Sequence, residues 1–231
     1  MPPAVMTTEL PDSLRDDVVD LAREDWANSL THGIGFLLSL WGAAALWSAA
    51  QPTNDAARIA GCAVYAATLT MVYAASTLSH LFQRPLVRRF FRTVDQACIY
   101  LLIVGTYTPI AAAYLHGGFL TILFWAMWIV ALVGFLSKTV WRHRVDAIST
   151  IGYLVLGWMP ILAVPAAISL VPPQALWLMV GGGVCYTIGV IFLVCDHRVP
   201  YFHVVWHLFV MAAGGIHYFA IYRYVAVGAG I

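Results

Sequence analysis

The distribution of charged residues along the chain is the feature that most restricts its fold. Residues 26–54 and 59–83 contain no Asp, Glu, Lys or Arg, and each segment can cross a hydrocarbon core of about 30 Å as one helix. Residues 96–137 and 147–195 are equally free of charge, and each is long enough for two crossings. Residues 199–222 supply one more span. The sequence therefore predicts an all-α integral membrane protein built as a bundle of seven transmembrane helices.

Turn-forming residues divide the two longest runs. The first breaks at Tyr114-Leu115-His116-Gly117-Gly118 and the second at Val171-Pro172-Pro173-Gln174. Composition agrees with a membrane protein, since the chain is 61% hydrophobic and 10% charged, with a mean hydropathy of +0.82. Residues 1–25 are acidic and lack the apolar segment of a signal peptide. We therefore expect a short acidic tail over residues 1–25 and a single seven-helix domain over residues 26–231.

Basic residues are concentrated on one side of the predicted bundle. Ten of the 12 Lys and Arg residues fall in the N-terminal tail or in loops on its side, and only Arg58 and Arg223 fall on the other. The positive-inside rule then predicts a cytoplasmic N-terminus and an outside C-terminus, the reverse of an opsin-like receptor. The basic stretch 84–94 is expected to be a cytoplasmic loop. A formal net charge of +1 gives no indication of a nucleic-acid partner.

Three histidines lie near the cytoplasmic ends of two predicted spans. His80 precedes Arg84 by four residues, and His203 and His207 follow Pro200, which suits the first turn of a helix. The i, i+4 spacing of the second pair places both rings on one helical face. Imidazole is a preferred zinc ligand, and three protein ligands leave one position open for water. The sequence thus predicts a Zn²⁺ site on these histidines, the alternative for each being a hydrogen bond to a neighbouring helix.

Two further polar residues are expected at the same membrane depth. Asp95 lies at the start of the third span, and Ser76 lies one turn before His80 on the same helical face. Ionisable groups within spans are costly and usually face an interior site. We predict that Asp95 holds a zinc-bound water or acts as its base, and that Ser76 hydrogen-bonds the water, a ligand ring or an oxyanion. Both are candidate catalytic residues.

Three other histidines are not predicted to bind the metal. His32 is expected at a similar depth, where it could line a pocket or bond a neighbouring helix equally well. His217 lies ten residues after His207, which corresponds to about 15 Å along a helix. His197 is expected to be a loop residue. The predicted metal site therefore contains three ligands.

These motifs resemble those of a known family. Ser76-x-x-x-His80, Asp95 and His203-x-x-x-His207 resemble the three-part signature of the progestin and adipoQ receptor family. The segment Glu24-x-x-x-Asn28-x-x-Thr31-His32-x-x-Gly35 is similar to the hemolysin III branch, which is found largely in bacteria. The resemblance covers essentially the whole chain. It implies zinc on the three histidines, with Asp95 and Ser76 around the water.

The wider superfamily includes alkaline ceramidases, which hydrolyse lipid amides at this kind of site. The resemblance therefore implies a zinc-dependent hydrolase in the cytoplasmic membrane that takes a lipid amide or ester from the cytoplasmic leaflet and serves membrane lipid homeostasis. Membrane lipids would be both environment and substrate. The alternative is a non-catalytic sensor or homeostasis protein in which zinc joins two spans, or a hemolysin-type pore. The sequence favours no particular oligomeric state.

Overall fold

The computed structural model describes residues 12–140 and 146–228, and this part of the chain is helical without any strand. It contains seven helical segments long and apolar enough to cross a membrane, as predicted. The fifth of these is divided into two α-helices by a 3₁₀ turn. The elements are α1 (Asp12–Ala50), η1 (Gln51–Thr53), α2 (Ala56–Leu81), α3 (Pro85–Tyr114), α4 (Gly118–Thr139), α5 (Asp146–Trp158), η2 (Met159–Ala163), α6 (Val164–Leu170), α7 (Pro173–Cys195), α8 (Phe202–Ile221) and the π-helical turn η3 (Tyr222–Ala226).

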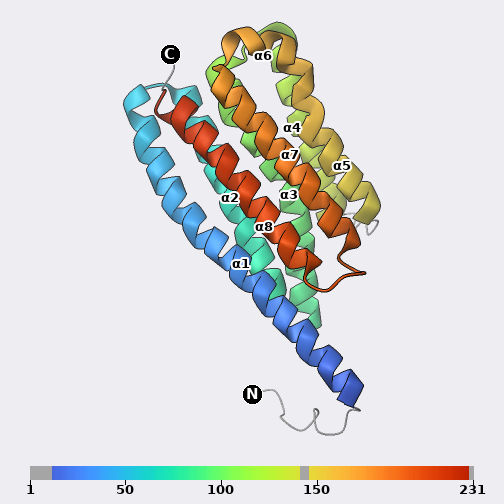
Figure 1. Cartoon of the computed structure of the whole chain (residues 1–231). Coiled ribbons are helices and arrows are strands. Elements are labelled where there is room, and N and C mark those ends of the chain that lie inside the picture. The colour runs from blue at the N-terminus through green and yellow to red at the C-terminus, as the bar shows by residue number, and fades with distance from the viewer. Residues whose placement is uncertain (1–11, 141–145, 229–231) are drawn as a thin grey trace.

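The spans form a closed bundle in which each packs against the next along the chain and α8 returns to contact α1 (Figure 1). The helix α3 is the most buried span. It approaches α2 closely at Gly61, where an added Cβ would lie 2.9 Å from the Cα of Pro109. Glycine at this position therefore lets the two backbones pack together.

Short signals in the sequence set the helix ends. The side chain of Asp55 caps α2 by accepting hydrogen bonds from the backbone N–H groups of Ala57 and Arg58, at 2.9 and 3.1 Å. Gly117 and Gly118, with φ of 85° and 48°, make the turn between α3 and α4. The two prolines after Val171 begin α7. Both predicted turns are confirmed.

Two segments differ from expectation. The prediction of a loop over residues 84–94 is wrong, because only Phe82 to Arg84 connect α2 with α3. Pro85 occupies the first turn of α3, where its fixed φ favours the helix and its missing N–H has no cost. The basic stretch therefore forms the beginning of α3. In addition, α1 begins at Asp12, well before the charge-free run, and projects beyond the rest of the bundle (Figure 1).

The basic residues segregate between the two ends of the bundle. Arg84, Lys138 and Arg198 lie at or near helix ends on the side where α1 begins. At the opposite end, the guanidinium of Arg58 donates a hydrogen bond to the carbonyl oxygen of Val225 at 3.5 Å. The end with more basic residues is also the end at which α2 finishes and α8 starts, which is where the three histidines lie.

Candidate metal centre

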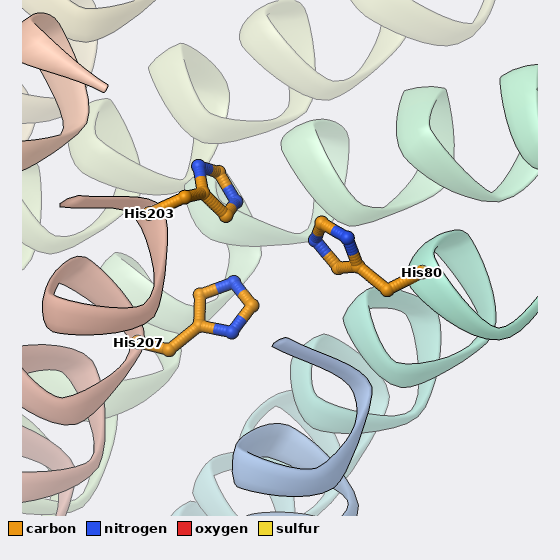
Figure 2. A group of neighbouring side chains, drawn as sticks. All are labelled: His80, His203 and His207. Carbon is orange, nitrogen blue, oxygen red and sulfur yellow. The ribbon is translucent and has the colours of Figure 1, made fainter. Parts of the chain in front are cut away.

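His80, His203 and His207 point toward one another from two helices (Figure 2). His80 lies in the last turn of α2, and the other two lie in the first two turns of α8. One ring nitrogen from each residue can be chosen so that all three atoms lie within 4.8 Å of one another. This group of histidines could hold a metal ion, and it is the only such group among the described residues.

Each of the three rings has its Nδ1 atom next to a hydrogen-bond acceptor. The Nδ1 of His80 lies 3.1 Å from Oδ1 of Asp25, and that of His203 lies 2.8 Å from Oδ2 of Asp196. The Nδ1 of His207 lies 3.3 Å from the backbone oxygen of Asn28. Carboxylate and carbonyl oxygens can only accept, so Nδ1 carries the hydrogen and Nε2 keeps its lone pair. This arrangement fits metal-binding histidines, which usually donate their other N–H to such partners.

The two carboxylates come from segments that flank the bundle end. Asp25 belongs to α1, and the same Oδ1 atom also accepts a hydrogen bond from Nη2 of Arg88 at 2.7 Å. Asp196 belongs to the turn between α7 and α8. Burial raises the pKa of Asp196, but the hydrogen bond from His203 and the charge interactions with His203 and Arg92 outweigh it, so the pKa lies below its ordinary value. The Asp196 carboxylate is therefore ionised at neutral pH.

Asp95 and Ser76 lie beside the histidine group. The carboxyl of Asp95 is close enough to Ser76, His203 and Arg92 to interact with them electrostatically. The Ser76 side chain is only 1% exposed, and its Oγ atom has no hydrogen-bond partner within the described structure. Both residues line the cavity that adjoins the histidines. The structure thus brings together the five residues that the sequence singled out.

The adjoining cavity has a volume of about 1200 Å³ and extends from the histidines far into the bundle. It reaches Leu115 and Ala167, which both lie near the end of the bundle opposite to the histidines. Most of the wall is apolar and belongs to α3, α5, α6, α7 and α8. This volume is larger than most small-molecule sites, and the apolar wall suits a hydrocarbon chain.

Three other histidines are not part of the metal group, although one of them touches it. His32 stacks on His207 with ring centroids 3.6 Å apart, lines the cavity, and has no hydrogen-bond partner for either ring nitrogen in this part of the structure. His217 bonds the backbone oxygen of Met179 at 3.0 Å. His197 is exposed in the turn before α8, as expected, and accepts a hydrogen bond from Nε of Arg198.

Sequence reasoning missed Asp25 and Asp196. Asp25 falls within the acidic tail expected over residues 1–25, and Asp196 stands beside the loop residue His197. A signal was available, because both acids lie next to predicted spans at the depth of the histidines. Pro200 also lies just before α8 and not in its first turn, since the helix starts at Phe202 after Tyr201 in a left-handed conformation (φ 64°). His203 is consequently the second residue of the helix.

Comparison with known proteins gives one family over most of the chain. Residues 21–218 match the family profile described as "Haemolysin-III related". "Hemolysin-3" from Bacillus cereus is 32% identical over 208 residues, which cover 90% of this chain and 94% of that protein. The "Hemolysin-3 homolog" of Bacillus subtilis (strain 168) is 32% identical over 202 residues, with coverages of 87% and 94%. The "Monocyte to macrophage differentiation factor" of Homo sapiens is 27% identical over 206 residues, with coverages of 87% and 84%. No solved structure matches the chain.

Proposed function

The chain belongs to the haemolysin-III-related family of membrane proteins, and from this premise we propose that it is a zinc-dependent intramembrane hydrolase of a lipid amide or ester. One observation carries the proposal. In each of the three imidazoles, Nδ1 donates to a neighbouring oxygen and Nε2 keeps a lone pair for a metal. The three rings lie at the end of an apolar cavity of about 1200 Å³. A metal site and a lipid-sized space therefore adjoin each other.

The donor set supports zinc in a catalytic setting. Catalytic zinc sites use three protein ligands and keep one position open, whereas structural sites are closed by four ligands, usually including cysteines. The four cysteines are free and none belongs to the histidine group. When bound, zinc would polarise a lipid carbonyl and lower the pKa of a water molecule toward about 7. His80, His203 and His207 would hold it.

The neighbouring residues support hydrolysis. Asp95 would accept a proton from the attacking water as the water oxygen bonds to the carbonyl carbon, and would return it to the leaving amine or alcohol as the C–N or C–O bond breaks. Ser76 has an unpartnered hydroxyl in the same wall and would donate a hydrogen bond to the carbonyl oxygen. The products would be a fatty acid and an amine or alcohol.

The concentration of basic residues at the histidine end supports the orientation. We propose that this end faces the cytoplasm, so that the lipid enters from the cytoplasmic leaflet of the cell membrane. The carbonyl would lie at the metal centre and the acyl chain in the apolar cavity. Turnover at this site would adjust membrane lipid composition.

A second candidate function follows from which helices carry the three histidines. All three come from α2 and α8, so a metal could simply hold the ends of these helices together in a sensor or homeostasis protein. The cavity and the unpartnered Ser76 hydroxyl favour the enzyme, because a structural site needs neither. Zinc-loaded protein in bilayer discs, supplied with cellular lipid extract, should release fatty acid detectable by mass spectrometry. An Asp95→Asn variant with intact zinc and unchanged lipid turnover would favour the structural role.

A further inference from the structure

The cavity contains a second group of polar side chains, distant from the metal centre, that hydrolysis does not use. Tyr107 of α3, Tyr186 of α7 and His217 of α8 all line it. Their two hydroxyl groups and the Nδ1 atom of His217 are buried, and none has a hydrogen-bond partner in the described part of the chain. We call these three residues the distal polar group.

Buried polar atoms without partners are costly, and native proteins contain few of them. Three such atoms line the part of this apolar cavity that lies away from the metal centre. The His217 side chain is 6% exposed, and its ring occupies space left by Gly182, where an added Cβ would lie 2.2 Å from Nε2 of His217. The bundle thus accommodates the imidazole in α8 by leaving α7 without a side chain opposite. These polar atoms need a partner that enters the cavity.

The hydrogen-bonding capacity of His217 defines that partner. Its Nε2 lies 3.0 Å from the backbone oxygen of Met179, which can only accept, so Nε2 carries the hydrogen. In the neutral ring, Nδ1 is then an acceptor that requires a donor. The Tyr186 ring lies 5.7 Å from the His217 ring, and its hydroxyl can donate as well as accept. A hydroxyl group can donate to Nδ1 and accept from a tyrosine, whereas a ketone or ester carbonyl cannot donate.

The helix rise gives the distance from the metal centre. His217 lies ten residues beyond His207 along α8, or about 15 Å. The Tyr186 hydroxyl is nearer, because it lies 3.7 Å from the Cβ position of Gly214, which is seven residues or about 10 Å beyond His207. An extended hydrocarbon chain advances by roughly 1.25 Å per bond. Tyr186 and His217 therefore lie roughly 8 to 12 bonds from the metal centre. Tyr107, twelve residues or about 18 Å beyond Asp95 along α3, lies slightly further.

We propose that the distal polar group binds a hydroxyl group in the middle of an acyl chain, so that the protein prefers lipids with a hydroxylated chain. The inference rests on the proposed function for the placement of the lipid head at the metal centre. The recognition itself needs no hydrolysis. It can therefore be measured as binding.

The test compares three fatty acids of equal length: octadecanoic acid, its mid-chain hydroxy derivative and its mid-chain oxo derivative. Their dissociation constants for the purified, zinc-loaded protein are measured by calorimetry. We expect the hydroxy acid to bind about tenfold more tightly than either of the others. The Tyr107→Phe, Tyr186→Phe double variant should weaken this preference, and adding His217→Phe, which removes the Nδ1 acceptor, should abolish it without lowering the affinity for octadecanoic acid. Tyr218→Phe is the matched control, because that hydroxyl donates to the Gly42 oxygen at 3.0 Å outside the cavity, and it should retain the preference.

Equal affinities for the three acids, or a preference that survives in the triple variant, would overturn the inference. The same comparison in His80→Ala separates it from the proposed function. All three affinities should fall there through loss of the zinc, but their ratio should persist. Lipid hydrolysis without a preference for the hydroxy acid would contradict only the proposed role of the distal polar group. A preference for the hydroxy acid without any release of fatty acid would contradict only the proposed hydrolase function.

Discussion

The Nδ1 atom of His80 lies 3.1 Å from an oxygen of Asp25, and Nη2 of Arg88 lies 2.7 Å from the same oxygen. One acid of α1 thus joins a candidate ligand on α2 to a guanidinium on α3. The hydrogen bond from Nδ1 holds the ring in the orientation that leaves Nε2 available to a metal. Asp196 does the same for His203. The two carboxylates therefore fix the orientation of two of the three candidate ligands.

Asp25→Asn should weaken zinc binding without abolishing it. The amide oxygen can still accept from Nδ1, but it lacks the negative charge that raises the basicity of the ring. We expect the dissociation constant to increase about 10- to 100-fold, as measured by competition with a chelator. Asp20→Asn is the control, since Asp20 pairs with Arg23 on the exposed surface of α1. Equal affinities in the parent and in Asp25→Asn would show that this carboxylate does not support the ligand.

Alanine at His80, His203 or His207 should remove most of the metal. Purified parent protein should contain about one zinc per chain, with three nitrogen ligands by X-ray absorption spectroscopy. Each variant should also lose the rise in Tm that added zinc gives the parent, because a metal that binds only the folded state stabilises it. His217→Ala should keep its zinc, since that ring bonds Met179 elsewhere in the cavity. Full occupancy in a His203→Ala, His207→Ala double variant would rule out the site.

Much of the fold could be predicted because charge and turn residues act locally. Charged residues are costly along most of a membrane-spanning helix, so the charge-free runs predicted the seven spans, and the glycines and prolines within them predicted the turns. The three histidines were recognisable for a related reason. The i, i+4 spacing placed His203 and His207 on one helical face. The position of His80 relative to Arg84, and of the pair relative to Pro200, placed all three at one depth.

Other features depend on how the helices pack. Asp25 lies among other acids in the sequence, and only the position of α1 against α2 brings it to His80. The stretch 84–94 looked like a loop because it is basic, yet Pro85 starts a helix there. Tyr107 and Tyr186 have the appearance of ordinary aromatic residues within spans. Their hydroxyl groups lack partners because a cavity separates the helices, and the sequence does not reveal that cavity.

Reporter fusions test the orientation. A reporter placed after Ile231 should be active only outside the cytoplasm, because seven spans place the two ends of the chain on opposite sides. A second reporter belongs in the short connection between Phe82 and Pro85, where it interrupts neither α2 nor α3. It should give a cytoplasmic signal. If both reporters are active on the same side, the proposed topology and the assignment of the metal centre to the cytoplasmic leaflet are wrong.

Asp95→Asn separates the enzyme from the structural metal site. The amide keeps the shape and the polarity of the side chain, so zinc content and Tm should stay close to those of the parent. It does not accept a proton as a carboxylate does, and the loss of a general base lowers turnover by about 10²- to 10⁴-fold. Asp55→Asn is the matched control. Asp55 caps α2 at the end away from His80, and asparagine caps a helix as well as aspartate does. Fatty acid release from lipid amides and esters should fall in the first variant and persist in the second. Equal release from both, with zinc retained, would exclude Asp95 as the base.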